Sequence, residues 1–141
     1  MPIKSGSAHW EGGLKDGKGT VSLQSGALDA QPYGFNTRFE DKVGTNPEEL
    51  VAAAHASCFS MALSMVMGEA GLTVGSIDTK ASVTLDTKDG GFAVTKSHLD
   101  VSVSSPGSDE AAVLEACETA KANCPISKLL TAEITMTATV V

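Results

Sequence analysis

The chain has 141 residues and a formal net charge of −7, and both its length and its acidity restrict what it can be. A chain of this length is expected to form one domain, residues 1–141, around one hydrophobic core. The acidic side chains are spread along the sequence. This argues against nucleic acid and against an anionic membrane surface as partners, because both require a basic face on the protein.

The first forty residues are rich in glycine and predict three short strands joined by turns. We expect these strands at residues 8–11, 19–28 and 33–39, with glycine and proline marking the turns between them. On this prediction Arg38 lies at the end of the third strand. The N-terminus has no apolar stretch of the kind that signal peptides carry, so the expected location is the cytoplasm.

A long helix is predicted to follow. Asn46 is a good N-cap, Pro47 suits the first helical position, and Glu49 stands where a capping box needs it. The helix should run to about residue 70, where Gly71 can end it. Residues 50–68 carry no formal charge and could span a bilayer, but they are rich in alanine and serine and have acidic flanks. We therefore expect a helix buried on all sides in a protein core, with no membrane as partner.

The second half predicts a hairpin, a helix and a closing strand. Residues 76–85 alternate as a strand, a turn follows at 89–91, and the return strand changes parity, which requires a bulge between 95 and 98. A helix is expected at 109–122 and a last strand at 133–141. The order predicts an α+β fold with a largely antiparallel sheet. One sheet and one small helix cannot cover an apolar helix on all sides, so we expect a homodimer.

Three cysteines are an odd number for a framework of structural disulfides. Cys117 falls on the apolar stripe of the second predicted helix and is expected to pack in the core. Cys58 lies inside the apolar helix, where it is either a small buried hydrophobe or a reactive thiol. Cys124 follows a helix end and precedes a proline, and we expect it to be the more accessible of the two.

Metal binding and Cys–His catalysis are the alternatives for these thiols. Only His55 and Cys58 stand at a short spacing, three residues apart and on one helical face, which is a weak signal for a metal site. The same spacing would allow His55 to activate Cys58. An apolar helix disfavours an imidazolium–thiolate pair, so a hydrogen-bonded core histidine is the preferred interpretation. We expect no metal and no cofactor.

Arg38 is the only arginine, against nine lysines. A solvated surface arginine is the simple interpretation. Because the chain otherwise uses lysine for positive charge, Arg38 is also a candidate for a functional role that needs a planar, permanently charged group. Such a group can clamp a carboxylate while it faces a thiolate.

Several of these segments resemble one family when taken together. Residues 44–50, residues 52–59 and Cys124-Pro125 resemble the OsmC/Ohr family of organic-hydroperoxide reductases. Residues 8–12 and 31–39 resemble the OsmC branch of that family. The resemblance covers nearly the whole chain, and its motifs occur together in the same order.

The resemblance implies an OsmC-like fold, with antiparallel sheets around a long buried central helix, in an intertwined homodimer whose active sites lie at the subunit interface. It implies a thiol-dependent peroxidase that reduces organic hydroperoxides and acts in oxidative or osmotic stress. Cys58 would be the peroxidatic and Cys124 the resolving cysteine, with Arg38 and Glu48 as further catalytic residues. The implied reductant is a dithiol, with lipoylated proteins among the candidates.

These roles agree with elementary electrostatics. A nearby guanidinium favours a thiolate, and a carboxylate such as Glu48 can hold that guanidinium in place. Glu48 and Cys58 are ten residues apart on one predicted helix, roughly 15 Å along its axis. Either the helix breaks near residues 52–54, or Glu48 serves the Cys58 of the other subunit, which is the interpretation we favour.

An apolar setting should favour organic peroxides over hydrogen peroxide. The candidate pocket residues are Phe39, His55, Phe59 and Met61. Two other classes stay open from the sequence alone. One is a non-catalytic stress or binding protein of the same fold, and the other is a metal-binding module.

Overall fold

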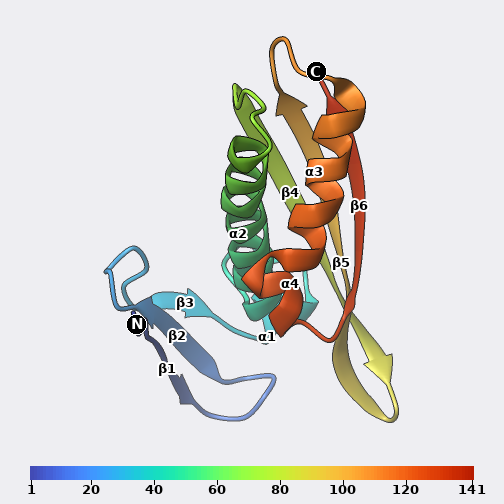
Figure 1. Cartoon of the computed structure of the whole chain (residues 1–141). Coiled ribbons are helices and arrows are strands. Elements are labelled where there is room, and N and C mark those ends of the chain that lie inside the picture. The colour runs from blue at the N-terminus through green and yellow to red at the C-terminus, as the bar shows by residue number, and fades with distance from the viewer. The chain divides into compact units, whose positions relative to one another are not determined.

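The computed structural model describes residues 1–141 and comprises two compact units, Met1–Leu50 and Val51–Val141. The elements follow one another along the chain as shown in Figure 1. They are β1 (Gly6–Glu11), β2 (Lys18–Leu23), β3 (Gln31–Tyr33), α1 (Phe35–Phe39), α2 (Pro47–Glu69), β4 (Ser76–Lys88), β5 (Gly91–Ser104), α3 (Glu110–Asn123), α4 (Pro125–Leu129) and β6 (Glu133–Val140). The α+β class predicted from the sequence is confirmed.

The first unit contains a three-stranded antiparallel sheet in the order β1-β2-β3. Gly19 in the middle strand pairs with Trp10 on one side and with Tyr33 on the other. The two aromatic rings lie 5.6 Å apart between centroids, and a Cβ atom at Gly19 would collide with both. Glycine at this position therefore permits the two aromatic side chains to meet across the sheet.

Two strand predictions in this unit are wrong in extent. The predicted strand 33–39 ends at Tyr33, and the chain then forms the one-turn helix α1. The hydroxyl of Thr37 accepts a hydrogen bond from the Gly34 N–H and donates one to the Gly34 carbonyl, both at 3.0 Å. This local exchange replaces strand pairing, so Arg38 lies on a helix. The predicted strand 19–28 likewise ends at Leu23, where a turn follows.

Helix α2 begins and ends as its capping residues predict. The Glu49 N–H donates to Asn46 Oδ1 at 2.8 Å, and Gly71, with φ of 72°, follows the last turn. There the Leu72 N–H donates back to the Met67 carbonyl at 2.9 Å, as in a Schellman motif. The helix is continuous over Pro47–Glu69, so the break considered near residues 52–54 does not occur.

The second unit contains a three-stranded sheet in the order β4-β5-β6. Strands β4 and β5 are antiparallel, and Thr95 is the extra residue of a bulge opposite Thr84 and Leu85, inside the predicted interval. The strand pairings are largely antiparallel, as predicted, but strand β6 runs parallel to β5, which the sequence did not indicate. The reason is that α3 and α4 form a crossover between the two strands, which returns the chain to the same end of the sheet.

Helices α2 and α3 cover one face of this sheet (Figure 1). The core between them combines aliphatic residues of β5 and α3 with a single stripe of α2, in which every fourth residue is buried. That stripe consists of His55, Phe59, Leu63 and Met67. The expectation that α2 is buried on all sides therefore does not hold within one chain, because one sheet and one helix cover only one face.

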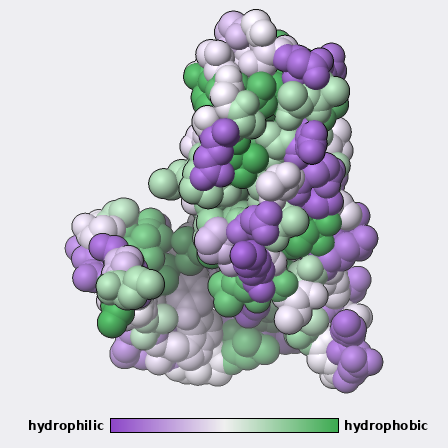
Figure 2. Space-filling model, viewed as in Figure 1, coloured by the Kyte–Doolittle hydropathy of each residue, from purple (hydrophilic) through white to green (hydrophobic).

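The remaining faces of α2 are exposed in the single chain. Met61 is 75% and Met65 60% exposed, and apolar surface is visible over this helix in Figure 2. By length and composition α2 is also the one helix capable of crossing a membrane, a property that core helices of soluble proteins share. An apolar surface of this kind on an ordered helix indicates a binding face.

Candidate active site

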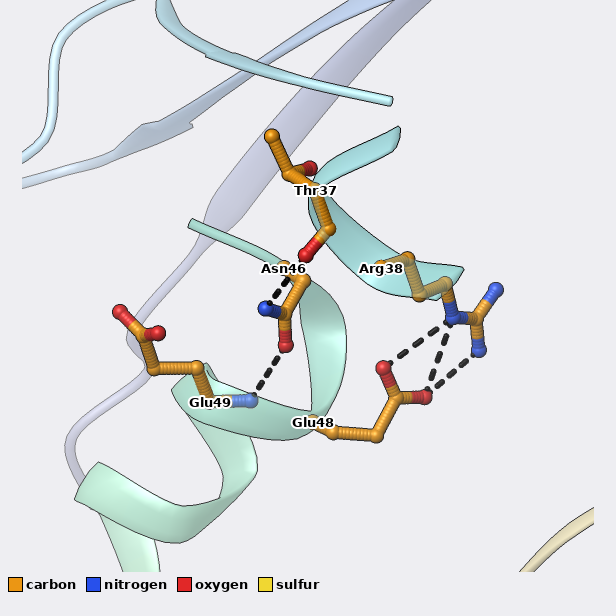
Figure 3. Close-up of polar contacts among 5 residues, drawn as sticks. All are labelled: Thr37, Arg38, Asn46, Glu48 and Glu49. Atoms are coloured by element: carbon orange, nitrogen blue, oxygen red, sulfur yellow. Dashed lines mark hydrogen bonds and ion pairs between the residues drawn. The ribbon is translucent and has the colours of Figure 1, made fainter. Parts of the chain in front are cut away.

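The first part of the candidate site is an ion pair between Arg38 on α1 and Glu48 in the first turn of α2 (Figure 3). Arg38 Nη2 lies 2.7 Å from Glu48 Oε1. Arg38 Nε lies 3.2 Å and 3.1 Å from the two carboxylate oxygens. A guanidinium that bonds to one carboxylate through two of its nitrogen atoms is fixed in orientation as well as in distance. The structure thus brings together the two charged residues that the sequence singled out.

Asn46 connects helix α1 to the beginning of helix α2. Its Oδ1 caps α2 by accepting from Glu49, and its Nδ2 donates to the Thr37 carbonyl of α1 at 3.0 Å (Figure 3). Thr37 is the direct neighbour of Arg38, so one amide side chain ties the beginning of α2 to the helix that carries the guanidinium. The sequence predicted the capping role of Asn46 but not this second contact.

An aromatic pocket of about 250 Å³ lies beside Arg38 in the same unit. The Arg38 guanidinium carbon is 5.2 Å from the centre of the Phe39 ring, and Phe39 in turn packs 4.9 Å from Phe35. The full lining consists of Trp10, Leu14, Tyr33, Gly34, Phe35, Arg38 and Phe39. Phe39 was a predicted pocket residue, whereas the other aromatic residues were missed. Their signal was composition, since four of the six aromatic residues fall within the first 39 positions.

The second part of the candidate site is a pair of reduced cysteines in the second unit. The Cys58 and Cys124 side chains lie within hydrogen-bonding reach of each other, across 66 residues of sequence. Cys58 keeps partial exposure, whereas Cys124 is fully buried. The expectation that Cys124 is the accessible thiol is therefore wrong. The chain does leave α3 at Cys124, but it forms α4 at once, and this short helix folds the thiol inward.

The surroundings of Cys58 within its own unit favour the neutral thiol. Burial raises the pKa of Cys58, and the hydrogen bond with the Cys124 thiol raises it further. The backbone N–H of Ile126 donates to the Cys58 sulfur and acts in the opposite direction. Since burial is the largest effect, Cys58 needs a further positive charge nearby in order to be a thiolate at neutral pH.

His55 is a core histidine whose two ring nitrogens are both hydrogen-bonded, as the preferred interpretation of the sequence expected. Its Nδ1 lies 2.7 Å from Ser97 Oγ and its Nε2 lies 2.8 Å from Ser127 Oγ. Burial lowers the pKa of His55, so the imidazole is neutral at physiological pH. Neither nitrogen is free to take a proton from Cys58.

The other predicted residues fall in different places. Phe59 is fully buried in the core beside α2's other stripe residues, and Met61 is exposed on the opposite face of that helix. Neither borders the pocket beside Arg38. Cys117 is fully buried on α3, as expected for core packing, and burial raises its pKa. No three His, Cys, Asp or Glu side chains gather closely enough to hold a metal ion.

Two free thiols within reach of each other, in an α+β chain, define a dithiol protein suited to redox chemistry. The family model for OsmC-like proteins matches residues 39–139. The chain is 60% identical to peroxiredoxin OsmC of Escherichia coli over 133 residues, which is 94% of this chain and 93% of that protein. The chain belongs to the OsmC family.

More distant relatives agree with this membership. The organic hydroperoxide resistance protein OhrB of Bacillus subtilis is 34% identical over 111 residues, 78% of this chain and 79% of its own. Among solved structures, an OsmC-like protein of unknown function from Vibrio cholerae superposes with a TM-score of 0.78. It covers 99% of this chain and 100% of its own at 19% identity, so this likeness supports the fold alone.

Proposed function

We propose that this chain reduces organic hydroperoxides to alcohols, with Cys58 as the attacking cysteine and Cys124 as the resolving one. It is a cysteine-based peroxidase of the OsmC family, and its relatives are named for peroxide reduction and for resistance to organic hydroperoxides. The observation that carries the assignment of residues is the contact between the Cys58 and Cys124 thiols. We place both units in one peroxidase domain, residues 1–141. Three free cysteines are in keeping with a reducing compartment such as the cytoplasm.

The proposed reaction balances without a metal or an organic cofactor. The Cys58 thiolate attacks the terminal oxygen of the hydroperoxide, the S–O bond forms, the O–O bond breaks, and the alkoxide leaves as the alcohol after it takes up a proton. Sulfur is oxidised by two electrons to the sulfenic acid. The Cys124 sulfur then attacks the Cys58 sulfur, water leaves, and a disulfide forms. An external dithiol reduces this disulfide by thiol exchange, and a lipoylated protein is our candidate for it.

Arg38 supplies the positive charge in this proposal, and Glu48 holds it in position. Burial raises the pKa of Cys58, and an opposite charge at close range lowers a thiol pKa by about one to three units. Because α2 is continuous from Pro47 to Glu69, Glu48 and Cys58 of one chain lie roughly 15 Å apart along the helix. We therefore propose that the Arg38–Glu48 pair of one chain acts on Cys58 of a second copy.

The exposed face of α2 supports a dimer of this kind. Met61 and Met65 lie on it and are largely exposed in the single chain. The helix has no lysine or arginine that would keep this face in water. A second copy of the chain would bury this surface, and we propose a homodimer in which α2 lies at the interface.

Thiol titration after exposure to peroxide tests the proposed reaction. One equivalent of cumene hydroperoxide should remove two of the three free thiols, and dithiothreitol should restore them. Cumene hydroperoxide should react about tenfold faster than hydrogen peroxide, because each buried apolar carbon contributes roughly 0.8 kcal/mol to binding. A non-catalytic protein would keep all three thiols, and a metal module would bind metal instead. Equal or faster reaction with hydrogen peroxide would contradict the organic substrate class.

Mixed dimers test whether the site is shared between chains. Cys58→Ser chains are expected to be inactive alone, and Glu48→Ala chains are expected to be slowed at most as much as Arg38→Met chains, because their guanidinium is no longer held in position. Equal mixing and re-association should restore about a quarter of the wild-type activity, because half of the dimers are mixed and each has one complete site. Mixing Glu48→Ala with Arg38→Met is the matched control and should restore nothing, since neither chain then has an intact ion pair. Absence of recovery in the first mixture would argue against the shared site.

A further inference from the structure

A buried chain of three polar side chains crosses the core of the second unit. Ser97 on β5 bonds to one nitrogen of His55 on α2, at 2.7 Å, and Ser127 on α4 bonds to the other, at 2.8 Å. All three residues are buried, and with Ser105 they are the only buried polar residues. Polar groups are costly to bury in a core of this size, so the burial of these three hydrogen-bonded side chains needs an explanation beyond packing.

The position of the Ser97–His55–Ser127 hydrogen bonds relative to the cysteines gives that explanation. His55 precedes Cys58 by three residues on α2, which places the two side chains on one helical face. Ser127 follows Cys124 by the same interval, with Cys124 as the N-cap of α4 and Ser127 in its first turn. The His55–Ser127 hydrogen bond and the Cys58–Cys124 contact therefore join the same two segments, one helical turn apart.

The first turn of α4 presents a second group to Cys58. The Ile126 N–H donates to the Cys58 sulfur, and Ile126 is the residue directly before Ser127. Helix α4 has only five residues, and its last residue, Leu129, is 72% exposed. A single turn of helix is not stable without contacts to the rest of the protein. The placement of α4 against α2 therefore depends on such contacts, and His55–Ser127 is the side-chain hydrogen bond that joins the two helices.

We propose that His55 is a positioning residue for the redox pair: through Ser127 it holds the first turn of α4 against α2, so that the Cys124 thiol and the Ile126 N–H both remain on Cys58. The proposal rests on the proposed function and adds a residue to it. His55 does not act as a base in this scheme, because both of its nitrogens are already bonded. Its effect reaches the reaction through the place of Cys124 and Ile126.

Two serine variants on the same imidazole separate positioning from folding. Ser127→Ala removes the bond to α4, whereas Ser97→Ala removes the bond to β5 and leaves α4 untouched. Both variants leave one buried ring nitrogen unsatisfied, so both should lose similar stability. In single-turnover experiments with cumene hydroperoxide, Ser127→Ala should form the disulfide about tenfold more slowly and accumulate a sulfenic acid that dimedone traps. Ser97→Ala should form it within about twofold of the wild-type rate.

A second measurement reports on the Ile126 contact. The pH dependence of Cys58 alkylation by iodoacetamide should move to higher pH in Ser127→Ala and stay in place in Ser97→Ala, because loss of a donor to sulfur disfavours the thiolate. Ser127→Thr keeps the hydroxyl and should restore both properties. Equal effects of the two alanine variants, or none from Ser127→Ala, would overturn the proposal. A wild-type chain that forms no disulfide between residues 58 and 124 would instead overturn the proposed function itself.

Discussion

Replacing Cys58 by serine is expected to reduce peroxidase activity by about a thousandfold or more, because a serine hydroxyl cannot supply the anionic nucleophile that the peroxide needs. Cys124→Ser should behave differently. It should still consume one equivalent of organic hydroperoxide, and it should then stop as a sulfenic acid at residue 58 when no small thiol is present. Rapid-mixing kinetics with intact-mass analysis measure both outcomes. The sulfenic acid is heavier than the reduced protein by one oxygen atom, whereas the disulfide is lighter by two hydrogen atoms.

Cys117→Ala is the matched control for these two variants. Cys117 is fully buried on α3 and belongs to the hydrophobic core, so its replacement should lower the free energy of unfolding by about 1 kcal/mol and leave the disulfide step intact. If the oxidised wild-type protein linked Cys58 to Cys117, or if Cys124→Ser completed the cycle at the normal rate, the assignment of the resolving cysteine would be wrong.

Replacing Arg38 by methionine is expected to slow the reaction with peroxide by about ten- to a thousandfold at neutral pH. The range follows from the one to three pKa units by which an opposite charge favours a thiolate. Burial and the Cys124 thiol raise the pKa of Cys58, so without the guanidinium the thiol is protonated at neutral pH. Below the pKa, the thiolate fraction rises tenfold per pH unit, and the activity of the variant should therefore climb steeply toward alkaline pH.

Two further variants define what Arg38 contributes. Lys15→Met removes a positive charge from the same unit, where Lys15 lies 5.9 Å over the Phe35 ring, and should leave the pH profile in place. Arg38→Lys keeps the charge but loses the fork that Glu48 holds, so its rate should fall between those of wild type and Arg38→Met. An Arg38→Met profile that coincides with the wild-type profile would remove the guanidinium from the mechanism.

The sequence predicted the elements that have local signals. Asn46, Pro47 and Gly71 set the ends of α2, and the parity change in the return strand located the bulge at Thr95. The two five-residue helices were missed, because one turn of helix is too short to show a period. The parallel pairing of β6 was missed for another reason. It depends on the crossover through α3 and α4, which no local pattern encodes.

The candidate site likewise has parts with a signal in the sequence and parts that depend on how distant segments meet. The lone arginine was visible in the sequence, the family resemblance added Glu48, and the structure joins the two in one ion pair. The aromatic pocket depends on Trp10 and Tyr33 meeting across Gly19, which is a product of strand register and not of spacing. The burial of Cys124 follows from α4, so an accessible thiol was expected where the structure has an enclosed one.

The unequal exposure of the two cysteines gives the proposed catalytic cycle a direction. Because Cys58 is partly exposed and Cys124 is fully buried, we expect an incoming dithiol to meet the sulfur of residue 58 first, and Cys124 to depart as the leaving thiolate. The mixed disulfide with the reductant would then be carried by the same atom that the peroxide oxidised. Peroxide and dithiol would then approach the Cys58 sulfur by the same route. We expect a high concentration of either one to slow the reaction of the other.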